Sequence, residues 1–234
     1  MKFKKLLKNT NIDYVNLLLN YIGNLFFSFC LVIALALIIF SSVTIECTVL
    51  GASMKPLYNS DPRKGNDVVY VNVYDHDYAI GDIIVIRVSA GDPIIKRVVA
   101  LAGDKVDIIK TDDGYKLEIN GKLIDEDYLQ IDTSLENETL RNGMFSSFEK
   151  LETLREEHTE LFDESGKYIV GENQVFAMGD NRHVSKDSTF YGAFDSSDIM
   201  GIVERSRFAG ESEFQFYIDY IFKGKFFESI ANCF

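Results

Sequence analysis

The pattern of hydrophobic and polar residues divides the chain into two unlike parts. No charged residue occurs from Ile22 to Ile45, whereas the residues that follow form short β-branched runs separated by polar turns. A helix rises about 1.5 Å per residue, so roughly 20 apolar residues cross a hydrocarbon core about 30 Å thick. The pattern therefore predicts one transmembrane helix joined to a β domain.

The residues before the apolar run indicate its orientation. This segment contains four lysines, at positions 2, 4, 5 and 8, and a single acidic residue, Asp13. The positive-inside rule then places the N-terminus in the cytoplasm. A cleaved signal peptide is the alternative, but the run exceeds the usual ~7–15 apolar residues, and no convincing small-x-small cleavage site follows it before Glu46. We expect residues 1–21 to be cytoplasmic, 22–45 to form an uncleaved anchor, and 46–234 to form an extracytoplasmic catalytic domain.

Short runs rich in β-branched residues, with Gly-Asp turns between several of them, predict the strands of this domain. The dipeptide Asn120-Gly121 adds a strong hairpin signal. The expected fold class is therefore mainly β, an all-β domain behind a single helix. The predicted strands are Asp67–Val73, Ile83–Val88, Ile94–Leu101, Val106–Ile109, Tyr115–Ile119, Lys122–Ile124, Tyr168–Met178 and Ile199–Arg205.

Two segments depart from the strand pattern. Asp125–Gly166 is acidic and polar, and within it Met144–Leu161 has apolar residues near helical spacing. It predicts an insertion on the β body with one helix, and a solvated acidic excursion is the open alternative. The aromatic segment Phe214–Phe234 is interrupted by charges, which favours a packed terminal element over a second span.

Composition narrows the function. The formal charge is −12, from 24 basic and 36 acidic residues. This balance argues against nucleic-acid binding, which depends on cationic side chains. The three cysteines and three histidines lack the paired spacing of a zinc site. We therefore expect no disulfide framework, no metal and no cofactor.

Three features exceed what a β scaffold needs. The first is GASMKP at 51–56, which alone is typical of a turn. The second is Lys96, which strand alternation places on one face with Ile94 and Val98. Burial there would lower the pKa of its amine and make it a general base, whereas an edge position would let it reach water. The third is the polar run GDNRHVSKDS at 179–188, which turn chemistry could also explain.

Together these features resemble a known family. The order SMKP, GDIIVI, IIKRVVALAGDKV and GDNRHVSKDS, behind a basic anchor, resembles the bacterial type I signal peptidases of peptidase family S26. These are membrane-bound serine proteases with a Ser-Lys dyad. The resemblance runs from about Lys2 to Arg205 and leaves out Asp125–Gly166.

The resemblance implies roles for individual residues. It makes Ser53 the nucleophile, with its backbone N–H in the oxyanion hole, and Lys96 the general base. A neutral amine needs no third group to fix a tautomer, as an imidazole does. The supporting residues it implies are Ser185, which orients the lysine amine, and Asp187, Asp180 and Asn181.

Two departures from the family pattern concern the support of the site. Gly51 stands where some relatives have a hydroxyl that serves as a second oxyanion donor. Thr189 stands where an arginine usually pairs with the aspartate that matches Asp187. We expect Arg182 or backbone N–H groups to take over this pairing.

The implied function is endoproteolytic removal of N-terminal signal peptides from secreted preproteins. The expected setting is the cell membrane, single-pass, with membrane lipid around the anchor, the secretion translocon nearby and no nucleic acid. A processing protease for a narrow client set, such as pilin subunits, is one alternative. A non-enzymatic anchored β domain is another, and a soluble Ser-Lys self-cleaving repressor is disfavoured by the anchor.

Overall fold

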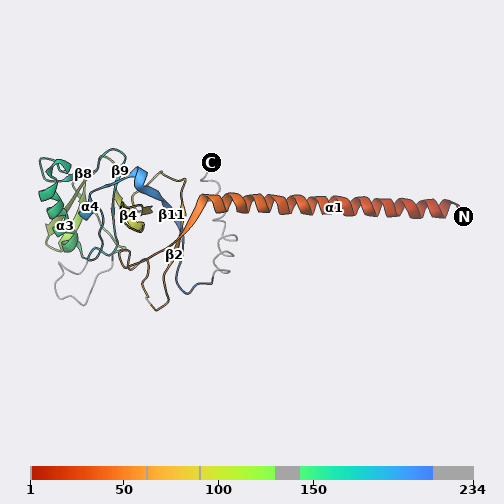
Figure 1. Ribbon diagram of the computed structural model, residues 1–234, viewed down its shortest axis with the longest axis horizontal. Coiled ribbons are helices and arrows are strands. Elements are labelled where there is room, and N and C mark those ends of the chain that lie inside the picture. The colour runs from red at the N-terminus through yellow and green to blue at the C-terminus, as the bar shows by residue number, and fades with distance from the viewer. Residues whose placement is uncertain (1, 62, 90, 130–142, 213–234) are drawn as a thin grey trace. The chain divides into compact units, whose positions relative to one another are not determined.

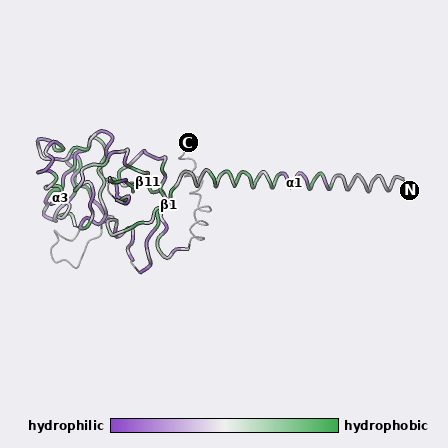
Figure 2. The backbone as a smooth tube through the Cα atoms, in the orientation of Figure 1, coloured by the Kyte–Doolittle hydropathy of each residue, from purple (hydrophilic) through white to green (hydrophobic). Residues whose placement is uncertain are grey.

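The computed structural model describes residues 2–61, 63–89, 91–129 and 143–212, and it divides at Val43 into two units. The first unit is helix α1 (Lys2–Val43). Its stretch Tyr14–Ala36 has a mean hydropathy of 2.0 and is long and apolar enough to cross a membrane. The apolar residues of α1 appear as green segments in Figure 2. The predicted terminal element Phe214–Phe234 lies outside the described residues, as do residues 130–142 of the insertion.

The second unit begins at Thr44 and contains two antiparallel sheets. The larger sheet has seven strands in the order β1-β2-β11-β3-β4-β9-β10. Its β-branched residues pack on both faces, so that all five positions of β2 are buried. Its strands are β1 (Thr44–Thr48), β2 (Val68–Asn72), β3 (Ile83–Ile86), β4 (Ile94–Ala100), β9 (Gln174–Met178), β10 (Phe194–Asp195) and β11 (Ile199–Arg207).

The smaller sheet has four strands in the order β7-β6-β5-β8. The predicted hairpin is confirmed, because β6 pairs with β7 across Asn120 and Gly121, which both have positive φ, 52° and 80°. Two positive φ angles are what a tight hairpin turn requires. The strands are β5 (Lys105–Thr111), β6 (Gly114–Ile119), β7 (Lys122–Leu123) and β8 (Tyr168–Ile169).

The single strand predicted at Tyr168–Met178 is wrong. It is two strands, β8 and β9, which belong to different sheets. A turn at Gly171–Asn173 separates them, with Asn173 at φ 58° and the Gln174 amide donating to the Gly171 carbonyl. The short strands β1 and β10 were not predicted, β1 because its first residues extend the apolar run of the helix.

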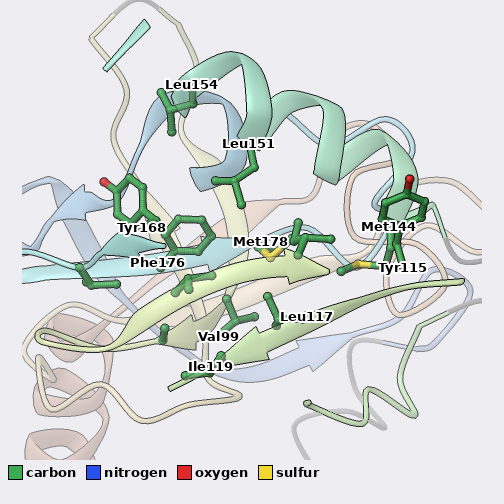
Figure 3. Packing of buried hydrophobic residues seen from close by; sticks show 14 residues of the cluster. Val99, Tyr115, Leu117, Ile119, Met144, Leu151, Leu154, Tyr168, Phe176 and Met178 are labelled. Carbon is green, nitrogen blue, oxygen red and sulfur yellow. The ribbon is translucent and has the colours of Figure 1, made fainter. Parts of the chain in front are cut away.

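The predicted helix of the insertion is confirmed. Helix α3 covers Met144–Glu157, and a short 3-10 helix, η1 (Thr159–Leu161), follows it. Its apolar face packs on the strands, with Leu151 pointing toward Met178 in Figure 3. The other face of α3 lies against α4 (Ser188–Tyr191), beside it in Figure 1. The described part of the insertion is thus packed on the β body rather than a solvated excursion.

Truncating Leu151 tests this packing. The side chain is fully buried, so Leu151→Ala should lower the free energy of unfolding by about 2–5 kcal/mol. The exposed Glu156→Ala on the same helix is the control and should change it by less than about 0.5 kcal/mol. Urea unfolding of the full chain in detergent measures both, and equal midpoints would contradict the packing.

Candidate active site

Ser53 lies in a turn that follows β1, and the side chains around it fix this turn. Met54 is buried in the core beside it. The Asn59 amide nitrogen donates to the carbonyls of Val49, at 2.8 Å, and Gly51, at 3.1 Å. Asn59 itself has a φ of 55°, a conformation that asparagine tolerates better than most residues. The turn is therefore held from inside, and Ser53 stays partly exposed.

Lys96 lies in the interior of the larger sheet. Strand β4 pairs with β3 on one side and β9 on the other, and Lys96 is opposite Ile84. Its side chain is 2 % exposed, so the alternative of an edge lysine reaching water is wrong. Its Nζ lies 3.1 Å from Ser53 Oγ and donates to the Ile95 carbonyl at 2.8 Å. The structure thus brings the two predicted dyad residues into hydrogen-bond contact.

The surroundings of Lys96 favour its neutral form. Desolvation by burial lowers the pKa of the amine to about 8, against the opposing charges of Asp187 and Asp180. Burial has the larger effect because the free energy that the ammonium loses on leaving water exceeds the free energy of its attraction to the two carboxylates. A substantial fraction of the amine is therefore unprotonated at mildly alkaline pH and can accept a proton.

The polar run Gly179–Ser188, named here the catalytic loop, docks on the backbone of Ser53. The backbone N–H of Asn181 donates to the Ser53 carbonyl at 2.9 Å. A Cβ at Gly179 would lie 2.5 Å from that carbonyl and 2.3 Å from Ser185 Oγ. Ser185 is fully buried, and its hydroxyl has no hydrogen-bond partner among the described residues. The predicted bond from Ser185 to Lys96 is therefore absent from this structure, although the loop places Ser185 beside the serine turn.

Asp180 forms an ion pair with Arg97. Both oxygens of the carboxylate accept from the guanidinium, at 2.9 Å and 2.7 Å. Arg97 follows Lys96 and so points to the opposite face of β4, where its guanidinium lies 4.2 Å from the ring centre of Tyr128. The pair joins the start of the catalytic loop to the strand that carries Lys96, and its bidentate geometry fixes how the two segments are oriented.

Among the described residues, the groups that donate hydrogen bonds to Asp187 are all neutral. The amide of Gly179 binds one oxygen at 2.9 Å, and the amide and hydroxyl of Thr189 bind the other at 3.1 Å and 2.8 Å. Arg182 instead pairs with Glu126 of the insertion, at 2.6 Å and 3.0 Å. The prediction that Arg182 would replace the family arginine is therefore wrong. Backbone N–H groups, the other prediction, do so together with the Thr189 hydroxyl.

A cavity of about 420 Å³ opens beside the dyad. Its walls come from β1 and the residues after it, from the start of β4, and from β2 and β3. They are mainly apolar, which suits a short apolar peptide segment next to Ser53. The lining residues are Cys47, Thr48, Val49, Leu50, Ser53, Val69, Val85, Asp92, Pro93, Ile94, Ile95 and Lys96.

Sequence reasoning missed several residues that support the site. Arg97 could have been found, because it follows Lys96 in β4 and alternation therefore places its side chain on the other face of the strand. Glu126 and Asn59 gave no signal, because Glu126 contacts a residue far away in the sequence, Arg182, and the contacts of Asn59 lie inside an irregular turn. The role of Thr189 was not predicted, because its hydroxyl donates a hydrogen bond to Asp187 at the position where a cation was expected.

Gly179 offers a test of the close docking of the catalytic loop. Gly179→Ala should lower the free energy of unfolding by about 1–3 kcal/mol or more, because the new methyl meets a backbone carbonyl. Gly171→Ala is the matched control at the other end of β9, where the methyl meets only the flexible Gln174 side chain. Melting temperatures of the two variants measure the difference, and equal shifts would contradict the docking.

Comparison with known proteins places the chain in a family. The family model described as signal peptidase, peptidase S26, matches residues 22–208. The chain is 31 % identical over 190 residues to signal peptidase I S of Bacillus subtilis, which covers 79 % of this chain and 83 % of that protein. It is 32 % identical over 172 residues to signal peptidase IB of Staphylococcus aureus, which covers 72 % of this chain and 80 % of that protein.

A crystal structure of a signal peptidase I from Enterococcus faecalis is also similar, with 26 % identity, a TM-score of 0.38, and coverage of 54 % of this chain and 97 % of that one. The family match includes both residues of the dyad and all of the catalytic loop. The chain belongs to the signal peptidase family, peptidase S26.

Proposed function

We propose that this protein is a signal peptidase I that removes N-terminal signal peptides from preproteins, with Ser53 as nucleophile and Lys96 as general base. The family and its named relatives support a serine endopeptidase with this activity. The observation that carries the residue assignment is the 3.1 Å contact between Lys96 Nζ and Ser53 Oγ at a buried position. An inert anchored β domain would have no use for an amine desolvated beside a serine.

The proposed reaction starts with the neutral amine. Because one N–H of Lys96 is donated to the Ile95 carbonyl, the lone pair is free to face Ser53. Ser53 Oγ attacks the carbonyl carbon of the scissile bond and its proton passes to Lys96. The resulting ammonium protonates the departing amine as the C–N bond breaks. Lys96 then takes a proton from water, which attacks the acyl ester, and returns this proton to Ser53 Oγ as the ester C–O bond breaks.

The negative oxygen of the tetrahedral intermediate needs hydrogen-bond donors. The Ser53 amide is one candidate, because nothing among the described residues accepts a hydrogen bond from it. Gly51 has no side chain to add a second donor. We assign Asn181, Asp180, Asp187 and Ser185 to the support of this arrangement through their contacts within and around the catalytic loop.

The substrate is proposed to bind as an extended strand with its apolar side chains in the cavity beside Ser53. Strand β1 is at the edge of the larger sheet and contributes Cys47 and Thr48 to the cavity wall. An exposed edge can pair with a peptide through main-chain hydrogen bonds. The limited volume favours small residues immediately before the cleaved bond.

We further propose that the predicted anchor, residues 22–45, holds the chain in the membrane through the part that lies in α1, up to Val43, because Thr44 and Ile45 already belong to β1. Residues 1–21 are proposed to be cytoplasmic and residues 46–234 to lie outside, near the secretion translocon. Helix α1 contains an apolar stretch of sufficient length, Tyr14–Ala36, that overlaps this anchor. The lysines at its start favour the cytoplasmic side. Membrane lipid would then surround the apolar part of α1.

The dyad is tested by three substitutions. Ser53→Ala and Lys96→Ala should each abolish nearly all cleavage of a preprotein, and the double variant should be little worse, because residues that act as a unit are not additive. Lys96→Arg should also be inactive, since a guanidinium does not give up its proton. Steady-state cleavage by the detergent-solubilised full chain measures this, and substantial activity of Lys96→Arg would refute the assignment.

The pKa of Lys96 predicts the pH dependence. Only the neutral amine can act, so kcat/KM should rise with pH and level off above about 8. Below that pH the amine is protonated and kcat/KM should fall about tenfold per unit. A profile that stays flat between pH 6 and pH 9 would be inconsistent with Lys96 as the base.

The membrane topology has its own test. Protease added to intact spheroplasts should digest the chain after Cys47, while a tag at the N-terminus stays protected until detergent is added. A mature protein that begins between Val43 and Ser53 would instead show that the apolar segment is a cleaved signal peptide.

A further inference from the structure

Lys150 of α3 extends from the insertion to the backbone of the catalytic loop. Its ammonium donates to the Ser185 carbonyl at 2.7 Å and lies 3.3 Å from the Arg182 carbonyl. The side chain is half-buried between α3 and the loop. A lysine that spans two carbonyls of one turn restrains that turn more than a surface charge does, because the amine and both acceptors lose water together.

The contact restrains the residue whose hydroxyl is next to the dyad. The amide of Ser185 donates to the Asn181 carbonyl at 3.0 Å, and its carbonyl accepts from Lys150. Both polar backbone groups of Ser185 are therefore fixed, one within the loop and one from α3. Since the Ser185 hydroxyl finds no partner among the described residues, its direction depends on the backbone that carries it.

Charge around Asp187 points to the same lysine. Burial lowers the pKa of the Lys150 amine, and the negative charge of Asp187 opposes the effect of burial there, as it does at Lys96 and Arg182. Arg182 is paired with Glu126, and Lys96 must be neutral to act as a base. Lys150 is the cation among these three that comes from α3 and binds the backbone of the catalytic loop.

We propose that Lys150 is a positioning residue for the Ser-Lys dyad: its ammonium fixes the backbone of Ser185 through the Ser185 and Arg182 carbonyls. It does not touch the substrate. This inference rests on the proposed function, because it concerns the dyad that this function requires. The insertion would then contribute to catalysis, because α3 carries Lys150.

A purely structural role of Lys150 must be separated from positioning. Arg155 provides the comparison, because it is a half-buried cation on the same helix that binds Asp107 at 2.9 Å and also contacts Glu152. These contacts join α3 to β5 and not to the catalytic loop. Loss of either cation should weaken the attachment of α3, but only loss of Lys150 should affect the dyad.

The experiment compares Lys150→Met, Lys150→Arg and Arg155→Met with wild type in the detergent-solubilised full chain. We expect Lys150→Met to lower kcat for preprotein cleavage by about tenfold or more, with KM within about threefold, because the defect lies in the dyad and not in peptide binding. Lys150→Arg keeps charge and donors and should retain kcat within about threefold. Arg155→Met should retain kcat within about twofold despite a lower melting temperature.

A kcat for Lys150→Met within twofold of wild type would overturn the inference, as would an equal loss of kcat in Arg155→Met. If Lys150→Met does not fold, Lys150→Gln, which keeps a donor without the charge, decides by the same criteria. A second readout, acetylation of Ser53 by p-nitrophenyl acetate followed by mass spectrometry, needs no signal peptide. A wild-type chain that cleaves no preprotein would contradict the proposed function, and the acetylation rates of the variants would still decide the role of Lys150.

Discussion

The structure of this protein depends on the burial of one amine beside one hydroxyl. Lys96 reaches Ser53 from an interior strand, and there it loses most of its hydration. Two carboxylates lie near enough to favour its charged form, Asp180 and Asp187. Each has other hydrogen-bond partners, Arg97 for Asp180 and neutral donors for Asp187. The cost of desolvating the ammonium outweighs the attraction of these two carboxylates, so burial remains the dominant effect on the pKa of the lysine.

The catalytic loop and the serine turn form one hydrogen-bonded unit. The Ser53 carbonyl accepts from the Asn181 amide, and Gly179 leaves room for both. The insertion then covers this unit through the ion pair between Arg182 and Glu126, which is almost fully buried. A buried pair of this kind contributes little net stability but is costly to break, so it fixes where the insertion lies.

The sequence predicted the parts of this arrangement that local patterns encode. β-branched runs predicted most strands and apolar spacing predicted α3, while the order of four motifs, through the resemblance to a known family, pointed to Ser53 and Lys96. Whether Lys96 is at an edge or in the interior depends on pairing of β4 with β9, a partner far along the chain. The pairing of Arg182 with Glu126 is long-range for the same reason. The turn at Gly171–Asn173 was missed although Gly171 and Asn173, between two apolar runs, are the residue types that favour turns.

The surroundings of Asp187 show that neutral hydrogen-bond donors can replace an arginine as the partners of a buried carboxylate. A carboxylate that accepts three hydrogen bonds is satisfied as an acceptor without any arginine, and Thr189 supplies two of the three. Hydrogen bonds from neutral groups do not cancel its charge, however, and that charge acts on every cation nearby. Arg182 is paired with Glu126, and Lys96 must lose its proton to act as a base. Helix α3 brings a third cation, Lys150, to the backbone of the same loop, so a segment that is an insertion in the sequence contributes directly to the surroundings of the site.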